Sequence, residues 1–329
     1  MSIKYQQGPF SSSIGAFLNG VRPGKPKFTE KDFPTLDGKV VIVTGASAGV
    51  GFQVVKLLLG TTNAKVYLFT RNKEKTETAI KKLETEVASE YNKKNLDVHY
   101  ILVDLGDLES IKPAAEQFLS LENRLDIVIH NAGVMVPPVG SKSKQGYELQ
   151  LGTNDLGPHL LQKFLDPLLI KTSKTNKPGE TRIVWVASFG HYMSPIGGVH
   201  WEDINFLKTE ASQMQKYGQS KAINILQAKG WNTAHPDGSN IISVSLCPGF
   251  LNTELQRHGP PSQRFLSNFL HNSKYGAYTE LFAALSPEVK TADHIQSFGK
   301  VTKARKDLSE PKHIQKAWDY LEENVKPYL

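Results

Sequence analysis

The stretch from Lys39 to Gly51, KVVIVTGASAGVG, constrains the fold of this chain more than any other. Five apolar or β-branched residues, Val40 to Thr44, have the length and composition of a buried strand. A glycine-rich turn follows, and apolar residues then recur at helical spacing from Phe52 to Leu59. This order of strand, tight turn and helix aims backbone N–H groups and the positive end of a helix dipole at a phosphate.

Glycines mark the turn itself. Gly45, Gly49 and Gly51 leave room for the backbone to approach a pyrophosphate and for the helix to pack on the strand. Ser47 and Val50 lie between them and are counted with them as candidate cofactor contacts. The glycine spacing alone is a modest signal, because an ordinary strand-to-helix turn is the alternative.

Strands and helices are expected to alternate from residue 39 onward. The expected strands are 39–44, 65–69, 98–103, 126–130, 182–187 and 241–246, with a weaker seventh near 298–301. The expected helices are 50–59, 74–91, 108–121, 145–169, 213–233 and 274–285. Apolar strands separated by helices predict an α/β fold with a doubly wound parallel sheet of about seven strands and helices on both faces. We expect a single domain over residues 39–329, after an extension at 1–38 that either lies on the surface or reaches the ligand site.

Bulk properties narrow the function classes. Lys and Arg exceed Asp and Glu by 39 − 32 = 7, which is too weak a positive charge to indicate nucleic-acid binding. The single cysteine, Cys247, excludes an internal disulfide and suggests a reducing compartment. No apolar run approaches the roughly 18 residues that would span a membrane. We therefore expect a cytoplasmic protein, with peripheral contact to a membrane surface left open.

Several polar residues follow the expected strands, at the sheet edge where ligands bind. The second strand ends at Arg71 with no carboxylate, so its guanidinium can hold a 2′-phosphate and favours NADP(H) over NAD(H). Asp104 and Leu105 follow the third strand, where a carboxylate can accept from an adenine amino group or cap the next helix. Asn131, Ala132 and Gly133 follow the fourth strand, and the two small residues let the backbone pass close to a ribose.

Three residues carry the expected chemistry. Tyr217 and Lys221 are four residues apart in a helical pattern, so their side chains share one face. An ammonium near a phenol stabilises the phenolate and lowers the pKa of the tyrosine, which can then protonate a carbonyl oxygen. Ser188 follows the fifth strand, where its hydroxyl can donate to the same oxygen.

Together these residues resemble the short-chain dehydrogenase/reductase superfamily, which has a Rossmann fold. The resemblance covers about residues 38–303. It is closest to the branch of retinol-dehydrogenase-like and WW-domain-oxidoreductase-like enzymes, in a fungal-type form. The motifs that carry it are Thr44-Gly45-x-x-x-Gly49-x-Gly51, Asn131-Ala132-Gly133, Asn154, Ser188, Tyr217-x-x-x-Lys221 and Pro248-Gly249. The residues that indicate the branch are Arg71, His130, Trp201 to Asn205, Tyr217 to Asn224 and Gly276 to Pro287.

The resemblance implies a role for each matching residue. Tyr217 resembles the general acid or base, and Lys221 the residue that holds the nicotinamide ribose. Ser188 is similar to the residue that polarises the carbonyl, and Asn154 to the helix asparagine that holds a water in a proton relay toward the lysine. The loop that contacts the nicotinamide end is represented by Pro248, Gly249, Leu251 and Thr253.

Some positions depart from the branch. Asp155, Pro158 and His159 stand where His, His and Phe are common, and Pro158 is expected to bend the helix that carries Asn154. No metal site is expected, because the histidines His159, His191 and His200 lack metal-ligand spacing.

The substrate pocket is expected to be apolar. Its walls should come from residues 134–138, 189–193 and a substrate loop at about 251–275. Phe265 and Phe269 stand four apart in that loop, so a short amphipathic helix is plausible there. It would serve as a lid, as part of the core, or as a shallow membrane contact.

These features favour an NADPH-dependent oxidoreductase that reversibly reduces a hydrophobic aldehyde or ketone to an alcohol. A non-catalytic NADP(H)-binding scaffold or redox sensor is the alternative, and a lyase or epimerase of nucleotide sugars is a third. The partner is a small-molecule carbonyl or alcohol. The resemblance leaves open a homodimer through the helices that carry Asn154 and Tyr217.

Overall fold

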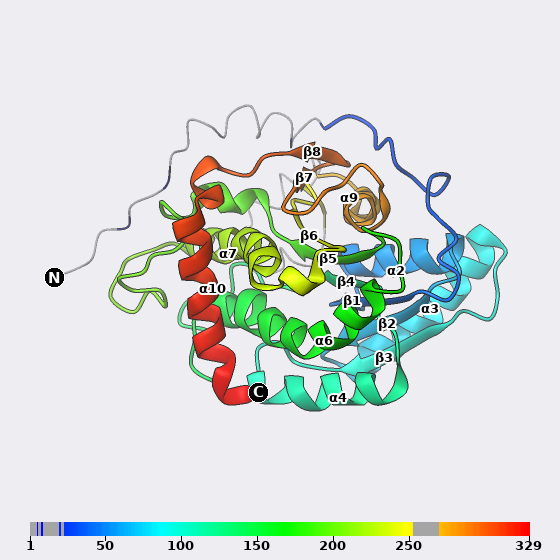
Figure 1. Cartoon of the computed structure of the whole chain (residues 1–329), viewed down its shortest axis with the longest axis horizontal. Helices are drawn as coiled ribbons and strands as arrows, with labels where there is room; N and C mark the ends of the chain where they lie inside the picture. The colour runs from blue at the N-terminus through cyan, green and yellow to red at the C-terminus, as the bar shows by residue number, and fades with distance from the viewer. Residues whose placement is uncertain (1–4, 6–7, 9–19, 21–22, 253–269) are drawn as a thin grey trace.

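An eight-stranded sheet forms the centre of the protein (Figure 1). The computed structural model describes Tyr5, Gly8, Gly20 and residues 23–252 and 270–329. The strand order is β3-β2-β1-β4-β5-β6-β7-β8, with every pair parallel except β7 and β8. The strands are β1 (Val40–Thr44), β2 (Lys65–Thr70), β3 (Val98–Leu102), β4 (Ile127–His130), β5 (Thr181–Val186), β6 (Ile241–Leu246), β7 (His294–Gln296) and β8 (Lys300–Thr302).

Helices cover both faces of this sheet, which confirms the doubly wound arrangement (Figure 1). One layer contains α2 (Gly49–Thr61), α3 (Lys73–Tyr91) and α9 (Ser273–Leu285). The other contains α4 (Ile111–Leu121), α6 (Gly157–Ser173) and α7 (Gln213–Ala234). Alternate residues of one strand serve the two layers: Val41 and Val43 pack with the first, Val40 and Ile42 with the second. Because helices bury both faces of the sheet, the residues that point to either face are apolar, and the central strands are continuous apolar runs in the sequence.

The last part of the sheet differs from the expected seventh strand near 298–301. Two short strands form a hairpin there, with β7 parallel to β6 and β8 antiparallel to β7. Gly299 lies in the turn between them with φ +83°. The strands are three residues each, too short to give a clear pattern of alternation in the sequence.

The helix that carries Asn154 also begins later than expected. The segment opens with one turn, α5 (Leu149–Leu151), continues as a π-helical turn, η2 (Gly152–Leu156), and then becomes α6. Glu148 caps this start by accepting hydrogen bonds from the backbone of Gln150 and Leu151. Pro158, which was expected to bend this helix, lies in the first turn of α6, directly after the π-helical turn.

A further helix, α10 (Pro311–Val325), was not expected from the sequence. Its buried residues Ala317, Leu321 and Val325 recur at helical spacing, with Pro311 in the first turn. The helix lies across α7 and α6 in Figure 1 and packs against both. It covers the outer side of the layer that holds the expected catalytic residues.

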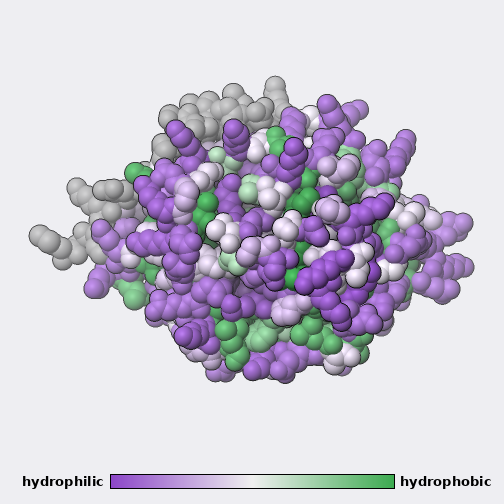
Figure 2. Space-filling model, in the orientation of Figure 1, coloured by the Kyte–Doolittle hydropathy of each residue, from purple (hydrophilic) through white to green (hydrophobic). Residues whose placement is uncertain are grey.

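Short helical turns complete the described chain. They are η1 (Leu108–Ser110), η3 (Phe189–Met193), η4 (Pro236–Gly238), η7 (Lys306–Ser309) and η8 (Lys326–Tyr328). Within the residues that the structure describes, none of the helices combines the length and apolarity needed to cross a bilayer. Hydrophilic side chains dominate the face shown in Figure 2, where apolar ones form small separate patches.

Candidate functional site

The turn between β1 and α2 has the shape of a phosphate cradle. Ala48 is the N-cap of α2 and offers no capping side chain, and the first turn of the helix contains no acidic residue. Gly45 has φ +68°, and a Cβ atom there would lie 2.8 Å from Cα of Ala132. The N–H groups that begin α2 are thus free of side-chain caps, which is the arrangement that suits a cofactor phosphate.

Asn131 holds the ends of β1 and β4 together. Its side-chain Nδ2 donates to the carbonyl oxygen of Thr44 at 2.8 Å, and the backbone N–H of Ala132 donates to Oγ1 of Thr44 at 2.9 Å. A Cβ atom at Gly51 would lie 2.4 Å from this same Nδ2, so Gly51 allows the approach. Asn131, Ala132 and the glycine turn therefore lie together at the carboxyl edge of the sheet, as the sequence predicted.

Arg71 and Asp104 are neighbours at the adjacent strand ends. Their side chains are 3.9 Å apart at the closest charged atoms, and that of Arg71 is 66% exposed. The carboxylate of Asp104 accepts from the backbone N–H of Gly106 at 2.9 Å, while Asp107 caps η1. The guanidinium is thus mostly open to solvent and can turn toward a ligand phosphate.

Ser188, Tyr217 and Lys221 meet at the same edge. Ser188 follows β5 and its Oγ accepts from the backbone N–H of Gly190 at 3.1 Å. Tyr217 is 4% exposed, and a Cβ atom at Gly190 would lie 3.0 Å from its ring. The missing side chain at Gly190 lets η3 pack closely on α7, which brings the phenol to the serine.

Lys221 points from α7 to the ends of the central strands. Its Nζ donates to the carbonyl oxygen of Val186 at 2.8 Å and to Oδ1 of Asn224 at 2.9 Å. The same Nζ lies 5.8 Å from the centre of the Tyr217 ring. A Cβ atom at Gly133 would lie 3.6 Å from it, so the small residues after β4 border the ammonium.

The pKa values of this pair are set by burial. Burial raises the pKa of Tyr217 to about 12, and the hydrogen bond with Ser188 lowers it only in part. This direction is opposite to the one expected from the neighbouring lysine. Burial lowers the pKa of Lys221 to about 8, although the carboxyl groups of Asp155 and Glu280 act in the opposite direction. For Tyr217 and Lys221 alike, the loss of solvent around the charged form is the largest effect on the pKa.

Asn154 lies in η2, where its side chain is fully used. Its Oδ1 accepts from the backbone N–H of Val134 at 2.8 Å, and its Nδ2 donates to Ser220 Oγ at 2.9 Å. The side chain therefore positions the loop after β4 at Val134. Its backbone carbonyl is linked to the lysine through Asn224, whose Nδ2 donates to it at 2.8 Å.

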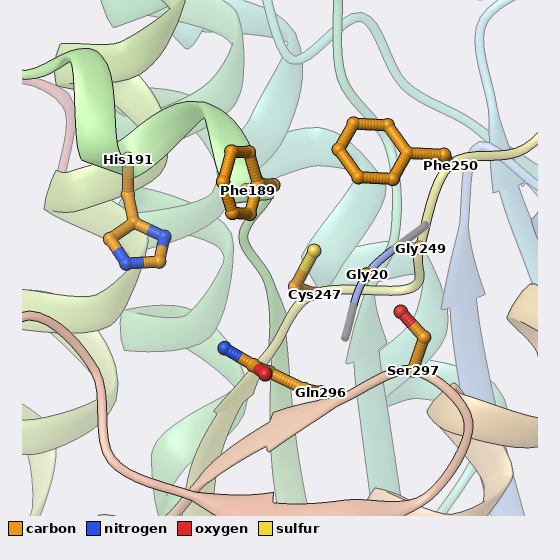
Figure 3. A pocket seen from close by; sticks show the side chains of 8 residues that line it. All are labelled: Gly20, Phe189, His191, Cys247, Gly249, Phe250, Gln296 and Ser297. Atoms are coloured by element: carbon orange, nitrogen blue, oxygen red, sulfur yellow. The ribbon is translucent and has the colours of Figure 1, made fainter. Parts of the chain in front are cut away.

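The loop after β6 forms a small pocket with η3 (Figure 3). The rings of Phe189 and Phe250 are neighbours, with centres 5.4 Å apart and planes tilted by 50°, and the side chain of Cys247 points toward them (Figure 3). The other residues around it are Gly20, His191, Gly249, Gln296 and Ser297. Pro248 and Leu251 belong to the same loop, and Leu251 pairs with His271. Thr253, Phe265 and Phe269 lie outside the described residues.

Sequence reasoning missed several residues around this edge. Asn224 stands three residues after Lys221, and this helical spacing was the available signal. Arg305 has no comparable signal, yet its buried guanidinium pairs with Asp307 at 2.7 Å and donates to the carbonyl of Ser194 just after η3 at 3.1 Å. Among the described residues, no group of acidic, histidine or cysteine side chains gathers in a way that could hold a metal ion.

The comparisons with known proteins agree with this geometry. A short-chain dehydrogenase/reductase of Emericella nidulans, pkfC, is 40% identical over 94% of this chain and 99% of its own. The chain belongs to the short-chain dehydrogenase/reductase family. The family profile described as short chain dehydrogenase matches residues 39–200. A family member from Phomopsis amygdali is 37% identical over 98% of this chain and 99% of its own length.

Solved structures share the fold. A crystal structure of an uncharacterized protein from Mycobacterium paratuberculosis superposes with a TM-score of 0.68, at 23% identity, over 91% of this chain and 97% of its own. The NADP complex of Pseudomonas aeruginosa RhlG gives a TM-score of 0.58, at 22% identity, over 80% and 95% of the two chains. Membership of this family makes the protein an oxidoreductase with a site for a nicotinamide cofactor, NAD or NADP.

Proposed function

We propose that this protein reduces a hydrophobic aldehyde or ketone to an alcohol with NADPH, and runs the reverse reaction with NADP. The observation that carries the proposal is the meeting of Ser188, Tyr217 and Lys221 at the carboxyl edge of the sheet, beside the phosphate cradle. The nicotinamide, when bound, supplies or accepts the hydride. The rest of the chemistry falls to groups of this chain.

The phenol of Tyr217 is proposed to give its proton to the carbonyl oxygen. The hydroxyl of Ser188 bonds the same phenol, so one substrate oxygen can receive hydrogen bonds from both groups. Lys221 is proposed to donate to a ribose hydroxyl of the cofactor with the N–H that Val186 and Asn224 leave free. Asn154 supports the pair from η2.

Preference for NADP(H) is proposed from the end of β2. Arg71 has an exposed guanidinium there, and the sequence from Phe69 to Lys73 contains no carboxylate that would bind ribose hydroxyls. The contact with Asp104 is long, at 3.9 Å, so it competes weakly with a 2′-phosphate. The candidate cofactor contacts are Gly45, Ser47, Gly49, Val50, Gly51, Arg71, Asp104, Leu105, Asn131, Ala132, Gly133, Pro248, Gly249, Leu251 and Thr253.

An apolar substrate is proposed from the pocket next to Ser188. Phe189 and Phe250 provide aromatic walls, and the pKa of Cys247 is raised to about 11 by burial, so its thiol is a neutral, small apolar neighbour. Tyr5 and Gly8 of the N-terminal extension contact η3 and the residue after it, since Tyr5 donates to the carbonyl of Met193 and Gly8 to that of Ser194. The extension is therefore proposed to border the substrate site.

One observation favours the alternative of a cofactor-binding scaffold. The pKa of Tyr217 is raised to about 12, so the phenol is a poor base at neutral pH in this arrangement. Carbonyl reduction requires only a phenol that donates its proton, which this pKa permits, whereas the reverse oxidation needs the phenolate and is expected to be slow at neutral pH. A reductase and a scaffold would both bind the cofactor, and only the reductase would convert a carbonyl substrate.

The decisive experiment compares the wild type with Tyr217→Phe. The wild type should oxidise NADPH in the presence of apolar aldehydes or ketones, measured by nicotinamide absorbance. The variant should bind NADPH normally and lose at least about 100-fold in kcat. Tight NADPH binding with no turnover on a broad carbonyl panel would support the scaffold, and a fully active variant would remove the assigned acid.

A further inference from the structure

Asn224 of α7 takes up one donor of Lys221. Its Oδ1 accepts from the Nζ of Lys221 at 2.9 Å, while the carbonyl of Val186 accepts from the same Nζ at 2.8 Å. An ammonium has three N–H donors. Two of them are thus fixed by the protein, which determines the direction in which the third can point.

The orientation of the Asn224 amide is unambiguous. Its Nδ2 faces three oxygens: the carbonyl of Asn154 at 2.8 Å, Oδ1 of Asp155 at 3.1 Å and Oε1 of Gln227 at 3.0 Å. A reversed amide would set an oxygen against three acceptors and an NH2 group against an ammonium. The amide oxygen must therefore face Lys221.

Pro158 explains why the carbonyl of Asn154 is available to a side chain. In a regular helix this carbonyl would accept from the N–H four residues later, which is position 158, and proline has none. Gln227 makes a parallel contact, since its Nε2 donates to the carbonyl of Asp155 at 3.0 Å. Two side chains of α7 thus donate to two successive carbonyls of η2.

We infer that Asn224 is a positioning residue that aims the ammonium of Lys221 and links it directly to the backbone of Asn154. The inference rests on the proposed function, because it assumes that Lys221 binds the cofactor ribose. The amide of Asn224 joins Lys221 to the carbonyl of Asn154 through two direct hydrogen bonds, beside which the water relay implied by the family resemblance stays a prediction. An amide does not readily gain or lose a proton, so the link transmits orientation and not protons.

The charge state of Lys221 gives this role a measurable consequence. The titratable groups that face the ammonium are Tyr217 on its own helix, Asp155 of η2, Cys247 after β6 and Glu280 of α9. Removing the amide of Asn224 withdraws one oxygen that stabilises the charged form of Lys221, and also the donor that bonds Asp155. The pKa of Lys221 should then fall.

The test is a fluorescence titration of NADPH binding between pH 6 and 10, on the wild type and Asn224→Leu. The variant should bind NADPH about tenfold more weakly at pH 7. The pH at which binding declines should move down by about half a unit or more. Asn232→Leu is the matched control, because Nδ2 of Asn232 also bonds a backbone carbonyl of α7, that of Ala228 at 2.8 Å. The control should retain the wild-type affinity and pH dependence.

Wild-type affinity and pH dependence in Asn224→Leu would overturn the inference, as would equal changes in the control. Asn224→Ala takes the place of the leucine variant if that protein does not fold, with the same expected shifts. The proposed function fails in a different way, through a wild type that binds neither NADPH nor NADH or turns over no carbonyl. If the wild type binds NADPH and reduces carbonyls, and the Asn224 variant binds NADPH as the wild type does, only the inference about Asn224 is wrong.

Discussion

A Cβ atom at Gly230 of α7 would lie 2.7 Å from Cε3 of Trp318 in α10, so the indole packs directly on the glycine backbone. The same ring meets His159 of α6 edge-on, with centres 4.7 Å apart. Glu322, one turn further along α10, contacts His159 at 3.0 Å and also pairs with Lys163. Helix α10 is thus fastened to both helices that it covers.

Gly230→Ala is expected to destabilise the protein. The added methyl group requires the indole or the helix to move, at a cost of about 1–3 kcal/mol. Urea unfolding monitored by circular dichroism measures the change. Thr233→Ala, at an exposed position of the same helix, is the control and should leave stability nearly unchanged. Equal stability of Gly230→Ala and the wild type would show that the space between Gly230 and Trp318 can accommodate a methyl group.

The position of α10 over α6 and α7 also predicts the oligomeric state. A homodimer through α6 and α7 would need surfaces that α10 already occupies. We therefore expect a monomer of 36.5 kDa in light scattering coupled to size exclusion. A dimer whose cross-links join α6 or α7 of two copies would contradict the prediction. Removing residues 311–329 should expose an apolar face and promote association.

Glu280 predicts an unusual dependence of stability on pH. Its carboxyl group is buried in α9, neither oxygen has a hydrogen-bond partner among the described residues, and burial raises its pKa to about 8. The folded state therefore keeps a proton up to about pH 8 that the unfolded chain loses near 4.5. The contribution of Glu280 to the unfolding free energy is thus full below pH 4.5, falls as the pH rises to 8, and stays low above that.

Glu280→Gln removes this titration while keeping the shape of the side chain. The variant should gain in thermal stability over the wild type as the pH rises from 5 to 9, by an amount equivalent to a few kcal/mol at the upper end. Glu288→Gln, at an exposed position just after α9, should follow the wild type at every pH. A constant difference between Glu280→Gln and the wild type would mean that Glu280 does not titrate in this range.

Arg71→Gln tests the proposed cofactor preference. Loss of the guanidinium should weaken NADPH binding by about 10- to 100-fold, because a hydrogen-bonded charge pair with the 2′-phosphate is lost. NADH binding should be unaffected, since NADH lacks that phosphate. Lys73→Gln, an exposed neighbour, should have a smaller effect. Equal weakening of both cofactors by Arg71→Gln would place Arg71 outside the 2′-phosphate site.

Local sequence was sufficient to predict the sheet and the glycine-rich turn between β1 and α2. The run Val40 to Thr44, the glycine turn and the apolar spacing from Phe52 are contained within twenty residues, so their conformation follows from neighbours along the chain. The predicted positions of Ser188, Tyr217 and Lys221 rested on similar local patterns. The same reasoning failed at the β7–β8 hairpin, because three-residue strands give weak periodic signals, and it missed α10 although Ala317, Leu321 and Val325 recur there at helical spacing.

The sequence by itself determined the doubly wound sheet and the order of the residues along its carboxyl edge. Only the tertiary structure decided what those residues touch. Asn224 lies 70 positions from Asn154, and Lys221 lies 35 from Val186, yet each pair is 2.8 Å apart. Burial around these contacts, and not the spacing of Tyr217 and Lys221, sets the pKa of both groups. Such contacts depend on how elements pack across the fold, and side-chain spacing within one element does not encode them.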